Sequence, residues 1–409
     1  MMPSSMYKRR WAGRFLLFMG LHASVLIFGL LIVPHCKTFE VFWNVPSRPC
    51  EKAGINIPLE DFEIKHNSGQ LFAGEKIVIF YEYKFGKIPY YAKYKPDQPI
   101  NGGLPQNCSL EEHLEMVRKH ITVTIPDKNF DGIAVIDLEE WRPLYDMNWG
   151  VKRVYQKQSK MFVTERFPSL SYNEVVAKAR EEFDKAARAF VVRTVEEARN
   201  LRPLARWGYY GFPFCNTDAG KDETDYNCSD WARQYNDRLN FIYKISDVLY
   251  PSIYLNGKTP EDQNLRFVQA VLNEARRVAE KQVPPRKFYA YTKFEYNPYK
   301  YWDAFYQKQD LCNSMKIPFD FGASGLILWS TSKSMRGRCK EIAGYVRKTL
   351  GPTLQYIRES AEMCHEQRCS RGGDCVLLSQ PSRCTMLIDP SEYECRCYDD
   401  HTGENCTGY

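Results

Sequence analysis

The sequence predicts an α/β protein in which parallel strands close into a distorted barrel, with a small disulfide-rich module after it. Short runs rich in Val, Ile and aromatic residues alternate with longer amphipathic runs, as in a parallel sheet covered by helices. About seven such units in one domain favour a barrel over an open sheet. Strands are expected at residues 39–45, 76–81, 132–138, 206–211, 248–255, 287–291 and 325–330.

The runs between these strands predict helices on the outside of the barrel. The segment 144–170 has Trp149, several lysines, Arg153 and Arg166, and is expected to rim a groove or to form a solvated basic face. Helices are expected at residues 111–120, 172–200, 231–245, 261–281, 301–315 and 340–362.

The first 36 residues predict a secretory signal or an uncleaved signal anchor. Lys8, Arg9, Arg10 and Arg14 precede an apolar run of about 19 residues, which is long enough to span a bilayer. We therefore expect a secreted, extracellular protein, with a retained membrane anchor or a lysosomal location as alternatives. The domains expected are residues 1–36, a barrel over 37–360 and a module over 361–409.

The charge balance limits the classes of partner. The formal net charge is +6, and loss of the four basic residues before position 37 leaves +2. A polyanionic substrate would therefore depend on locally placed Arg and Lys side chains, because the field of the whole protein is weak. No motif indicates nucleic-acid binding, and the histidine spacing indicates no metal or cofactor.

Fourteen cysteines, combined with an export signal, predict disulfide bonds. The last ones are spaced Cys364-x4-Cys369-x5-Cys375 and Cys395-x-Cys397-x8-Cys406, which resembles an epidermal-growth-factor-like (EGF-like) module. Such a module needs disulfides because about 45 residues cannot bury enough apolar surface. A protein partner is the further binding partner that we expect for this module.

The most informative segment is residues 132–143, with the sequence GIAVIDLEEWRP. An apolar run typical of a buried strand ends in Asp137 and Glu139, whose side chains point to the same side because they are two residues apart. Like-charge repulsion and partial burial raise one pKa, so that one carboxyl group keeps its proton for acid catalysis. The alternative is a strand end whose acids are merely solvated or paired with Arg142.

Residues 135–143 resemble the signature of the animal hyaluronidases, glycoside hydrolase family 56. Five further stretches resemble the same family in the same order: FEVFWNVP from residue 39, NGGLPQ from 101, WGYYGFPFC from 207, DVLYPSIY from 247 and GLILWS from 325. The resemblance covers nearly the whole chain beyond about residue 38. It implies a TIM-like barrel and hydrolysis of hyaluronan.

The resemblances also imply disulfide pairs, namely Cys50–Cys339 and Cys215–Cys228 in the barrel, and Cys364–Cys375, Cys369–Cys395 and Cys397–Cys406 in the module. Cys36, Cys108, Cys312 and Cys384 are left over. Without Cys36 at least one thiol is unpaired within the chain, and spacing leaves a Cys108–Cys312 pair open. Three sequons, at Asn107, Asn227 and Asn405, have cysteine in the middle position, so glycosylation competes with disulfide formation.

The expected active site lies at the carboxyl ends of the strands, where barrel enzymes bind their substrates. Glu139 is the expected general acid and base, with Asp137 as its helper. The resemblance implies that the N-acetyl carbonyl of the substrate is the nucleophile in a retaining, substrate-assisted reaction. The substrate-binding residues that we expect are Tyr81, Glu82, Arg142, Tyr210, Tyr254 and Trp329.

Three functions therefore compete. The first is an endo-acting β-N-acetylhexosaminidase that cleaves the β-1,4 bonds of hyaluronan, and chondroitin as a second substrate. The second is a catalytically silent hyaluronan-binding or adhesion protein, which has no chemical need for both acids. The third is chitinase-like hydrolysis, which normally needs further spaced acids where Ala134 and Val135 stand.

Overall fold

The computed structural model describes residues 39–398 and 400–408. The expected signal or anchor over residues 1–36 lies outside these residues. In the described part of the chain, no helix combines the length and the apolar character that a membrane crossing requires.

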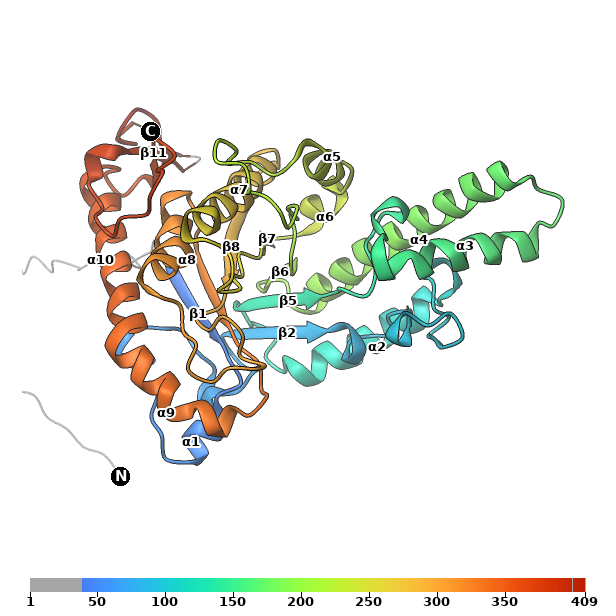
Figure 1. Ribbon diagram of the computed structural model, residues 1–409, viewed down its shortest axis with the longest axis horizontal. Helices are drawn as coiled ribbons and strands as arrows, with labels where there is room; N and C mark the ends of the chain where they lie inside the picture. Colours follow the sequence, from blue (N-terminus) through green and yellow to red (C-terminus); the bar gives the residue numbers. More distant parts are fainter. Residues whose placement is uncertain (1–38, 399, 409) are drawn as a thin grey trace, which may run out of the picture. The chain divides into compact units, whose positions relative to one another are not determined.

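Seven parallel strands of the described residues form the barrel (Figure 1). Strands β2, β5 and β6 pair in that order, and so do β7, β8, β9 and β1. A parallel bridge between Tyr210 and Tyr250 joins β6 to β7. The strands are β1 (Glu40–Asn44), β2 (Ile77–Tyr81), β5 (Ile133–Asp137), β6 (Arg206–Tyr209), β7 (Val248–Leu249), β8 (Lys287–Thr292) and β9 (Gly325–Trp329).

The barrel is distorted between β1 and β2, where a short connecting segment takes the place of direct strand pairing. The backbone of Lys65 bonds to Val41 and Trp43 of β1. The buried side chain of Asn67 then bonds to both backbone groups of Ile77 in β2, with its Nδ2 at 2.9 Å from the carbonyl oxygen and its Oδ1 at 3.0 Å from the nitrogen. An amide side chain can do this because it both donates and accepts.

The expected strand at 248–255 is much shorter than predicted. Only Val248–Leu249 form regular β7, because Pro251 has no N–H to donate and ends the ladder. The chain still runs beside β8, since Ile253 donates to the Tyr291 carbonyl at 2.9 Å. Tyr254 therefore comes from an irregular segment at the end of this strand.

Helices surround the barrel, and three expected helices differ from the structure. The helix expected at 301–315 begins later, at Lys308. The expected helix at 231–245 is divided into α5 and α6, and that at 340–362 into α9, a π-helical turn (Val346–Leu350) and α10. The helices are α1 (Arg48–Lys52), α2 (Leu110–Thr124), α3 (Arg153–Arg166), α4 (Tyr172–Leu201), α5 (Asp230–Arg238), α6 (Asn240–Ile245), α7 (Glu261–Glu280), α8 (Lys308–Asp320), α9 (Met335–Tyr345) and α10 (Gly351–Gln367).

Helix α3 was not expected and lies in the segment predicted to rim a groove. Its buried residues Tyr155, Ser159 and Val163 are four residues apart and form one narrow face. They lie against α4, and Figure 1 shows the two helices side by side. Most of the other residues of α3 are polar, which concealed the helical pattern.

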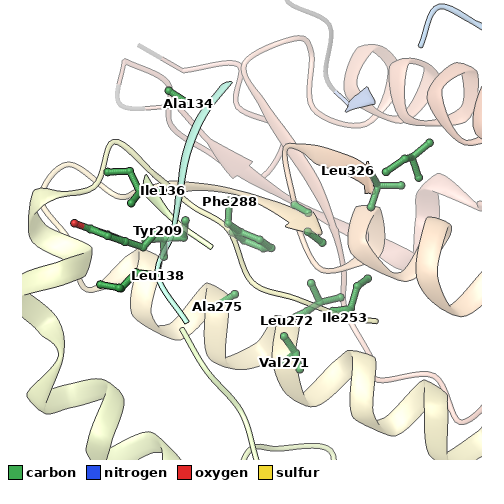
Figure 2. Close-up of a cluster of buried hydrophobic side chains, with 14 of the residues drawn as sticks. Ala134, Ile136, Leu138, Tyr209, Ile253, Val271, Leu272, Ala275, Phe288 and Leu326 are labelled. Carbon is green, nitrogen blue, oxygen red and sulfur yellow. The ribbon is translucent and has the colours of Figure 1, made fainter. Parts of the chain in front are cut away.

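Two layers of apolar side chains lie on the two faces of the strands. Ile133 and Val135 of β5 point into the barrel, where they meet Tyr250, Tyr291 and residues of the other strands. The alternate residues Ala134 and Ile136 point outward, toward the helices. Figure 2 shows this outer layer, with Leu272 and Ala275 of α7 among its members.

Six disulfide bonds link the described cysteines. They join Cys50–Cys339, Cys215–Cys228, Cys312–Cys384, Cys364–Cys375, Cys369–Cys395 and Cys397–Cys406. Five of them are the pairs that the resemblances imply. The sixth corrects the Cys108–Cys312 pair that spacing had left open, because Cys312 bonds to Cys384 and Cys108 is a free thiol.

The C-terminal segment contains an antiparallel pair of strands, β10 (Gly373–Leu377) and β11 (Tyr393–Cys397). It begins without a break in the backbone, since α10 runs through the expected boundary at residues 360 and 361. Besides the Cys312–Cys384 bond, the Tyr393 hydroxyl donates to Asp320 of α8 at 2.5 Å. The segment is thus fixed to the barrel through α8. The remaining strands, β3 (Tyr90–Tyr91) and β4 (Pro99–Ile100), form a separate antiparallel pair.

Candidate active site

Asp137 is the last residue of β5 and points into the barrel, on the same face as Ile133 and Val135. It is paired in register with Tyr81 of β2. Its side chain is buried, and within the described part of the chain its Oδ1 atom has no hydrogen-bond partner. A buried polar atom without a partner destabilises the fold, so this one suggests a functional site.

Glu139 follows two residues later, in the turn beyond the strand. Its side chain reaches solvent, yet the surrounding protein desolvates it enough to raise its pKa, against the opposing effects of Lys152 and Arg142. Burial, and then the charge of Glu139, raise the pKa of Asp137. The two carboxyl groups are coupled, so the pair keeps a proton at a pH where ordinary acids have lost theirs.

Glu82 holds the turn that carries Glu139. One of its carboxylate oxygens accepts hydrogen bonds from the backbone N–H groups of Glu139, at 2.6 Å, and of Glu140, at 2.7 Å. Burial raises the pKa of Glu82 to about 7, although these two bonds oppose the shift. Glu82 was expected to contact substrate, but this oxygen is occupied by the backbone of the acid-bearing turn.

Lys152 binds the same turn from its other side. Its ammonium group donates to the carbonyl oxygens of Glu139 and Glu140 and to the hydroxyl of Tyr94. Glu140 itself is buried and accepts from Tyr155 at 3.2 Å and from Tyr83. Glu139 is therefore the member of the Glu139–Glu140 pair that remains available in the cavity.

A cavity of about 370 Å³ opens at this turn. Glu139, Arg142 and Tyr210, all expected site residues, contribute to its wall. Larger hollows lie elsewhere, including one of about 760 Å³ next to residues 56–70, but Glu139 is not part of their walls. The lining of the 370 Å³ cavity is Tyr94, Leu138, Glu139, Trp141, Arg142, Met147, Lys152, Tyr210, Gly211, Phe212 and Phe214.

Arg142 does not form an ion pair with either acid in the described structure. Its Nη1 atom donates to the Met147 carbonyl at 2.9 Å, and its guanidinium group stacks on Trp149, at 4.4 Å from the ring centroid. The alternative in which the acids merely pair with Arg142 therefore does not apply.

Aromatic side chains from four strand ends form a continuous wall. The Trp329 indole donates to the Tyr81 hydroxyl at 3.0 Å and stacks on Tyr254 with ring centroids 5.9 Å apart. The Tyr254 ring lies 6.1 Å from that of Tyr210, whose hydroxyl is 3.1 Å from Ser252 Oγ. All four expected aromatic residues thus lie together, and we define them as the aromatic wall.

Tyr209, the neighbour of Tyr210, has the opposite orientation. It is buried outside the barrel, and its hydroxyl donates to the Val191 carbonyl of α4 at 2.9 Å. Tyr209 is thus a core residue. Gly208 faces inward, where a Cβ atom would lie 2.2 Å from the Val248 carbonyl, so β6 can approach β7 only with glycine there.

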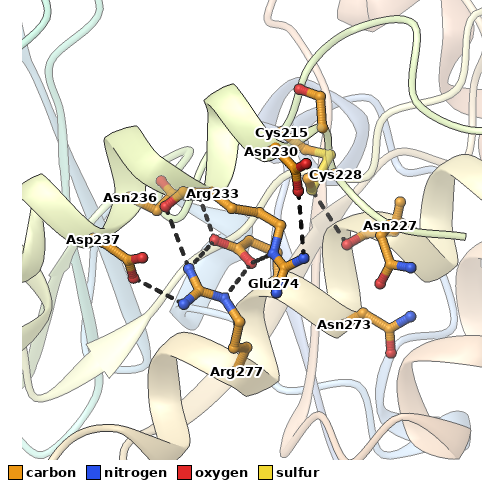
Figure 3. Close-up of polar contacts among 12 residues, drawn as sticks. Cys215, Asn227, Cys228, Asp230, Arg233, Asn236, Asp237, Asn273, Glu274 and Arg277 are labelled. Carbon is orange, nitrogen blue, oxygen red and sulfur yellow. Dashed lines mark hydrogen bonds and ion pairs between the residues drawn. A yellow bond between two sulfur atoms is a disulfide. The ribbon is translucent and has the colours of Figure 1, made fainter.

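A buried polar network holds the loop that follows Tyr210. The Asn236 side chain bonds to both backbone groups of Phe214, accepting at 3.2 Å and donating at 2.8 Å. Asn236 also donates to Glu274 of α7, which pairs with Arg277 (Figure 3). The Cys215–Cys228 bond closes the same loop. These contacts fix the side of the cavity formed by Phe212 and Phe214.

Comparison with known proteins gives the family. The model of the hyaluronidases, glycoside hydrolase family 56, matches residues 31–404. The chain belongs to this family. It is thus a member of a glycoside hydrolase family. The family agrees with the barrel that the sequence predicts.

Comparisons with individual proteins agree with this family. A chondroitin hydrolase of Caenorhabditis elegans is 38% identical over 370 residues, which cover 90% of this chain and 80% of the relative. Hyaluronidase-1 of Homo sapiens is 33% identical over 363 residues, with coverages of 87% and 82%. The crystal structure of bee venom hyaluronidase in complex with a hyaluronic acid tetramer has a TM-score of 0.72 and 32% identity, and covers 78% of this chain and 99% of that one.

Sequence reasoning missed two residues of this site. Lys152 and Tyr94 lie in the cavity wall, but neither belongs to a recognisable motif. The only signal for Lys152 was its place in the lysine-containing segment 144–170.

Proposed function

We propose that this hyaluronidase-family chain is a secreted, endo-acting β-N-acetylhexosaminidase that cleaves β-1,4 bonds of hyaluronan with retention. One observation carries the proposal. Two coupled carboxyl groups, Asp137 and Glu139, occur at the carboxyl end of a barrel strand without a cation bound to either of them in the described structure. Carboxyl groups left in this state are expected where a proton must be donated near neutral pH.

Glu139 is the proposed general acid and base. It reaches the solvent of the cavity, and its raised pKa keeps it protonated for donation to the departing glycosidic oxygen. After the leaving sugar departs, the Glu139 carboxylate accepts a proton from the attacking water. The acid and base steps thus restore the enzyme to its starting protonation state.

The substrate supplies the nucleophile. Asp137 and Glu139 extend from the same strand end, so they cannot easily flank one sugar from opposite sides, as an acid and a protein nucleophile would. The carbonyl oxygen of the N-acetyl group instead attacks the anomeric carbon and forms a cyclic intermediate, which water opens with retention. Asp137, buried with an unpartnered oxygen, shares a proton with Glu139 or orients the acetamido group.

The aromatic wall is the proposed surface for the N-acetylated sugar. Tyr210 shares the cavity wall with Glu139, and the Tyr254 ring lies against Tyr210. Burial raises the pKa of both tyrosines, so they stay neutral donors. Trp329 packs against the acetamido methyl group, and Tyr81, which accepts from the Trp329 indole, lines the same cleft. Arg142 lies in the cavity wall and positions the acids or contacts a substrate carboxylate. We assign Glu82 the positioning of Glu139.

Chondroitin is the second proposed substrate, because a relative at 38% identity is a chondroitin hydrolase. The two polymers differ in one hydroxyl configuration and in sulfation. A catalytically silent hyaluronan-binding protein is the alternative, but it would not require two desolvated carboxyl groups.

An extracellular location is supported by the six disulfides, which persist in oxidising compartments. Of the three sequons, Asn227 and Asn405 precede disulfide-bonded cysteines, whereas Asn107 precedes the free Cys108. We propose Asn107 as the sequon at which a glycan does not compete with a disulfide. The EGF-like classification of residues 361–409, and a protein partner for them, remain predictions.

The test is hydrolysis by Glu139→Gln, which keeps the size of the side chain but removes the acid. Purified protein is incubated with hyaluronan, chondroitin and chitin oligosaccharides from acidic to neutral pH, and the product anomers are resolved by NMR. We expect kcat for hyaluronan to fall at least roughly a thousandfold, and the wild type to release the β-anomer first. Undiminished turnover by the variant, or an inverted product, would refute the mechanism.

A further inference from the structure

The loop between β8 and α8 presents aromatic side chains to solvent. We define residues 296–306 as the aromatic loop. Tyr299, Tyr301 and Trp302 are 53%, 49% and 50% exposed. Large aromatic residues at this exposure lose hydrophobic stabilisation, so their grouping in one short loop suggests a binding surface.

The loop is ordered by its own contacts. The backbone N–H of Tyr296 donates to the Ala304 carbonyl, and the backbone N–H of Tyr306 donates to the Phe294 carbonyl, both at 2.9 Å. The inward-facing Phe305 ring stacks on Tyr345 of α9 with centroids 4.4 Å apart. Phe305 is partly buried and packs against the core, so the loop is held there without the exposed rings.

The aromatic loop continues the aromatic wall. The Tyr299 ring centroid lies 6.3 Å from that of Trp329, the residue proposed to pack on the acetamido methyl group. Trp302 lies close to the start of α9, where a Cβ atom on Gly337 would be 3.2 Å from its ring. The apolar surface therefore extends from the proposed cleavage site toward α9.

Lys293 lies where the wall and the loop meet. Its Nζ atom is 5.2 Å from the Tyr254 ring centroid and donates to the Tyr296 carbonyl at 2.9 Å. Within the described residues no carboxylate lies within ion-pair distance of it, because nearby Glu295 binds Arg338 at 2.7 and 2.9 Å. Burial lowers the pKa of Lys293 to about 8.

A half-buried ammonium group without a counter-ion is unfavourable in the unliganded protein. Lys293 uses one hydrogen bond out of the three that an ammonium group can donate. It differs in this from Lys152, which is engaged by two carbonyls and a hydroxyl. An anionic group on the substrate would supply the missing charge.

We propose that Lys293, Tyr299 and Trp302 form an additional subsite for the glycosaminoglycan chain beyond the cleavage point. Tyr299 and Trp302 stack on sugar rings, and Lys293 binds the carboxylate of a uronic acid. This inference rests on the proposed function, because it assumes that the aromatic wall binds the adjacent sugar. It predicts that the polymer is held over more sugars than the acid site itself touches.

The experiment compares substrates of different length. The variants are Lys293→Gln, Lys293→Arg and the double variant Tyr299→Ala/Trp302→Ala. Matched controls are Lys157→Gln on α3 and Tyr172→Ala on α4, both exposed and away from the loop. Steady-state kcat and KM are measured on hyaluronan tetrasaccharide and decasaccharide, and on unsulfated and sulfated chondroitin decasaccharides.

We expect Lys293→Gln and the double variant each to raise KM for decasaccharides roughly tenfold and to leave KM for the tetrasaccharide unchanged. Lys293→Arg is expected to retain most of the affinity for decasaccharides, because it keeps the positive charge. A larger loss on sulfated chondroitin than on hyaluronan would mean that Lys293 binds sulfate, which overturns the carboxylate assignment. Equal loss on short and long substrates, or no loss, would overturn the subsite.

Binding measurements separate this proposal from the proposed function. Titration calorimetry of the same oligosaccharides is performed in the Glu139→Gln background. If the wild type cleaves none of them, the hydrolase proposal fails. The subsite is still judged by whether the loop variants weaken decasaccharide binding and spare tetrasaccharide binding.

Discussion

The pKa values of carboxyl groups are shifted in opposite directions at the two ends of the barrel interior. At the amino end, Glu40 is bound by Arg206 at 2.7 Å, by Lys65 and by the hydroxyl of Tyr289. Burial alone would raise the pKa of Glu40, but these partners lower it overall. At the carboxyl end, no cation among the described residues forms an ion pair with Asp137 or Glu139, and their pKa values are raised.

The two ends differ in where their cations bind, and not in how many cations lie near the carboxyl groups. Arg142 and Lys152 lie near the acids at the carboxyl end, but they donate to backbone carbonyls. A compensated carboxylate stabilises the fold, whereas an uncompensated one keeps a proton available. The comparison therefore separates a structural end of the barrel from a functional one.

After the effect of Glu139→Gln, the next largest effect is expected for Asp137→Asn. We expect kcat to fall roughly a hundredfold, or about 2.7 kcal/mol, because the helper of the acid is lost. In the wild type, activity falls as rising pH removes the proton from the carboxyl pair. Burial and the charge of Glu139 make Asp137 hold its proton to a higher pH than an ordinary acid. Without Asp137 the pair therefore gives up its last proton at lower pH, and the basic limb of the pH–rate profile moves toward acid.

Glu40→Gln is the matched control, since it removes the same charge from the other end. An unchanged basic limb in Asp137→Asn, or an equal shift in Glu40→Gln, would contradict the coupling of the acids.

Glu40→Gln is itself expected to destabilise the protein by about 2 kcal/mol, because Arg206 is left partly buried beside Lys65 without its counter-ion. The folded-state pKa of Glu40 lies below its ordinary value of 4.5. Its contribution is therefore present above that pH and is lost as the pH falls through the folded-state pKa. Urea unfolding at pH 7 and at pH 3 measures both effects.

If the amino end is purely structural, kcat/KM of the folded Glu40→Gln variant equals that of the wild type. A loss of activity without a loss of stability would contradict the division between the two ends.

The smallest of these effects is expected at Glu82. Glu82→Ala removes the acceptor for the N–H groups of Glu139 and Glu140 and should lower kcat roughly tenfold, or about 1.4 kcal/mol. Glu82→Gln keeps an acceptor oxygen and should restore most of kcat, with KM little changed in both variants. A rise in KM with kcat unchanged would instead indicate the substrate contact expected from the sequence.

The sequence predicted those residues of the site that lie at the ends of strands. Asp137, Tyr210 and Trp329 follow from apolar runs with polar or aromatic ends, because such runs become barrel strands whose carboxyl ends converge. Contacts between distant segments were not predictable. Glu82 reaches a turn 57 residues away, and Arg142 stacks on Trp149 instead of pairing with an acid.

Helices were predicted where a broad apolar stripe is present. Helix α4, with its buried Phe183, Ala187 and Phe190, was expected within one residue of its observed end. Helix α3 was missed because only a narrow face is buried. The Cys312–Cys384 bond was beyond prediction, since it depends on the C-terminal segment folding back on α8.

Helix α8 is buried at every position from Asp310 to Asp320, although five of its side chains in that range are polar or charged, namely Asp310, Asn313, Ser314, Lys316 and Asp320. Lys316 and Asp320 pair at 2.8 Å beneath Tyr393, so water is kept from this helix by the last residues of the chain. Those residues therefore serve as the outer wall of the enzyme on this side. Removing them would expose the Lys316–Asp320 pair to solvent, and the barrel would lose part of its cover on this side.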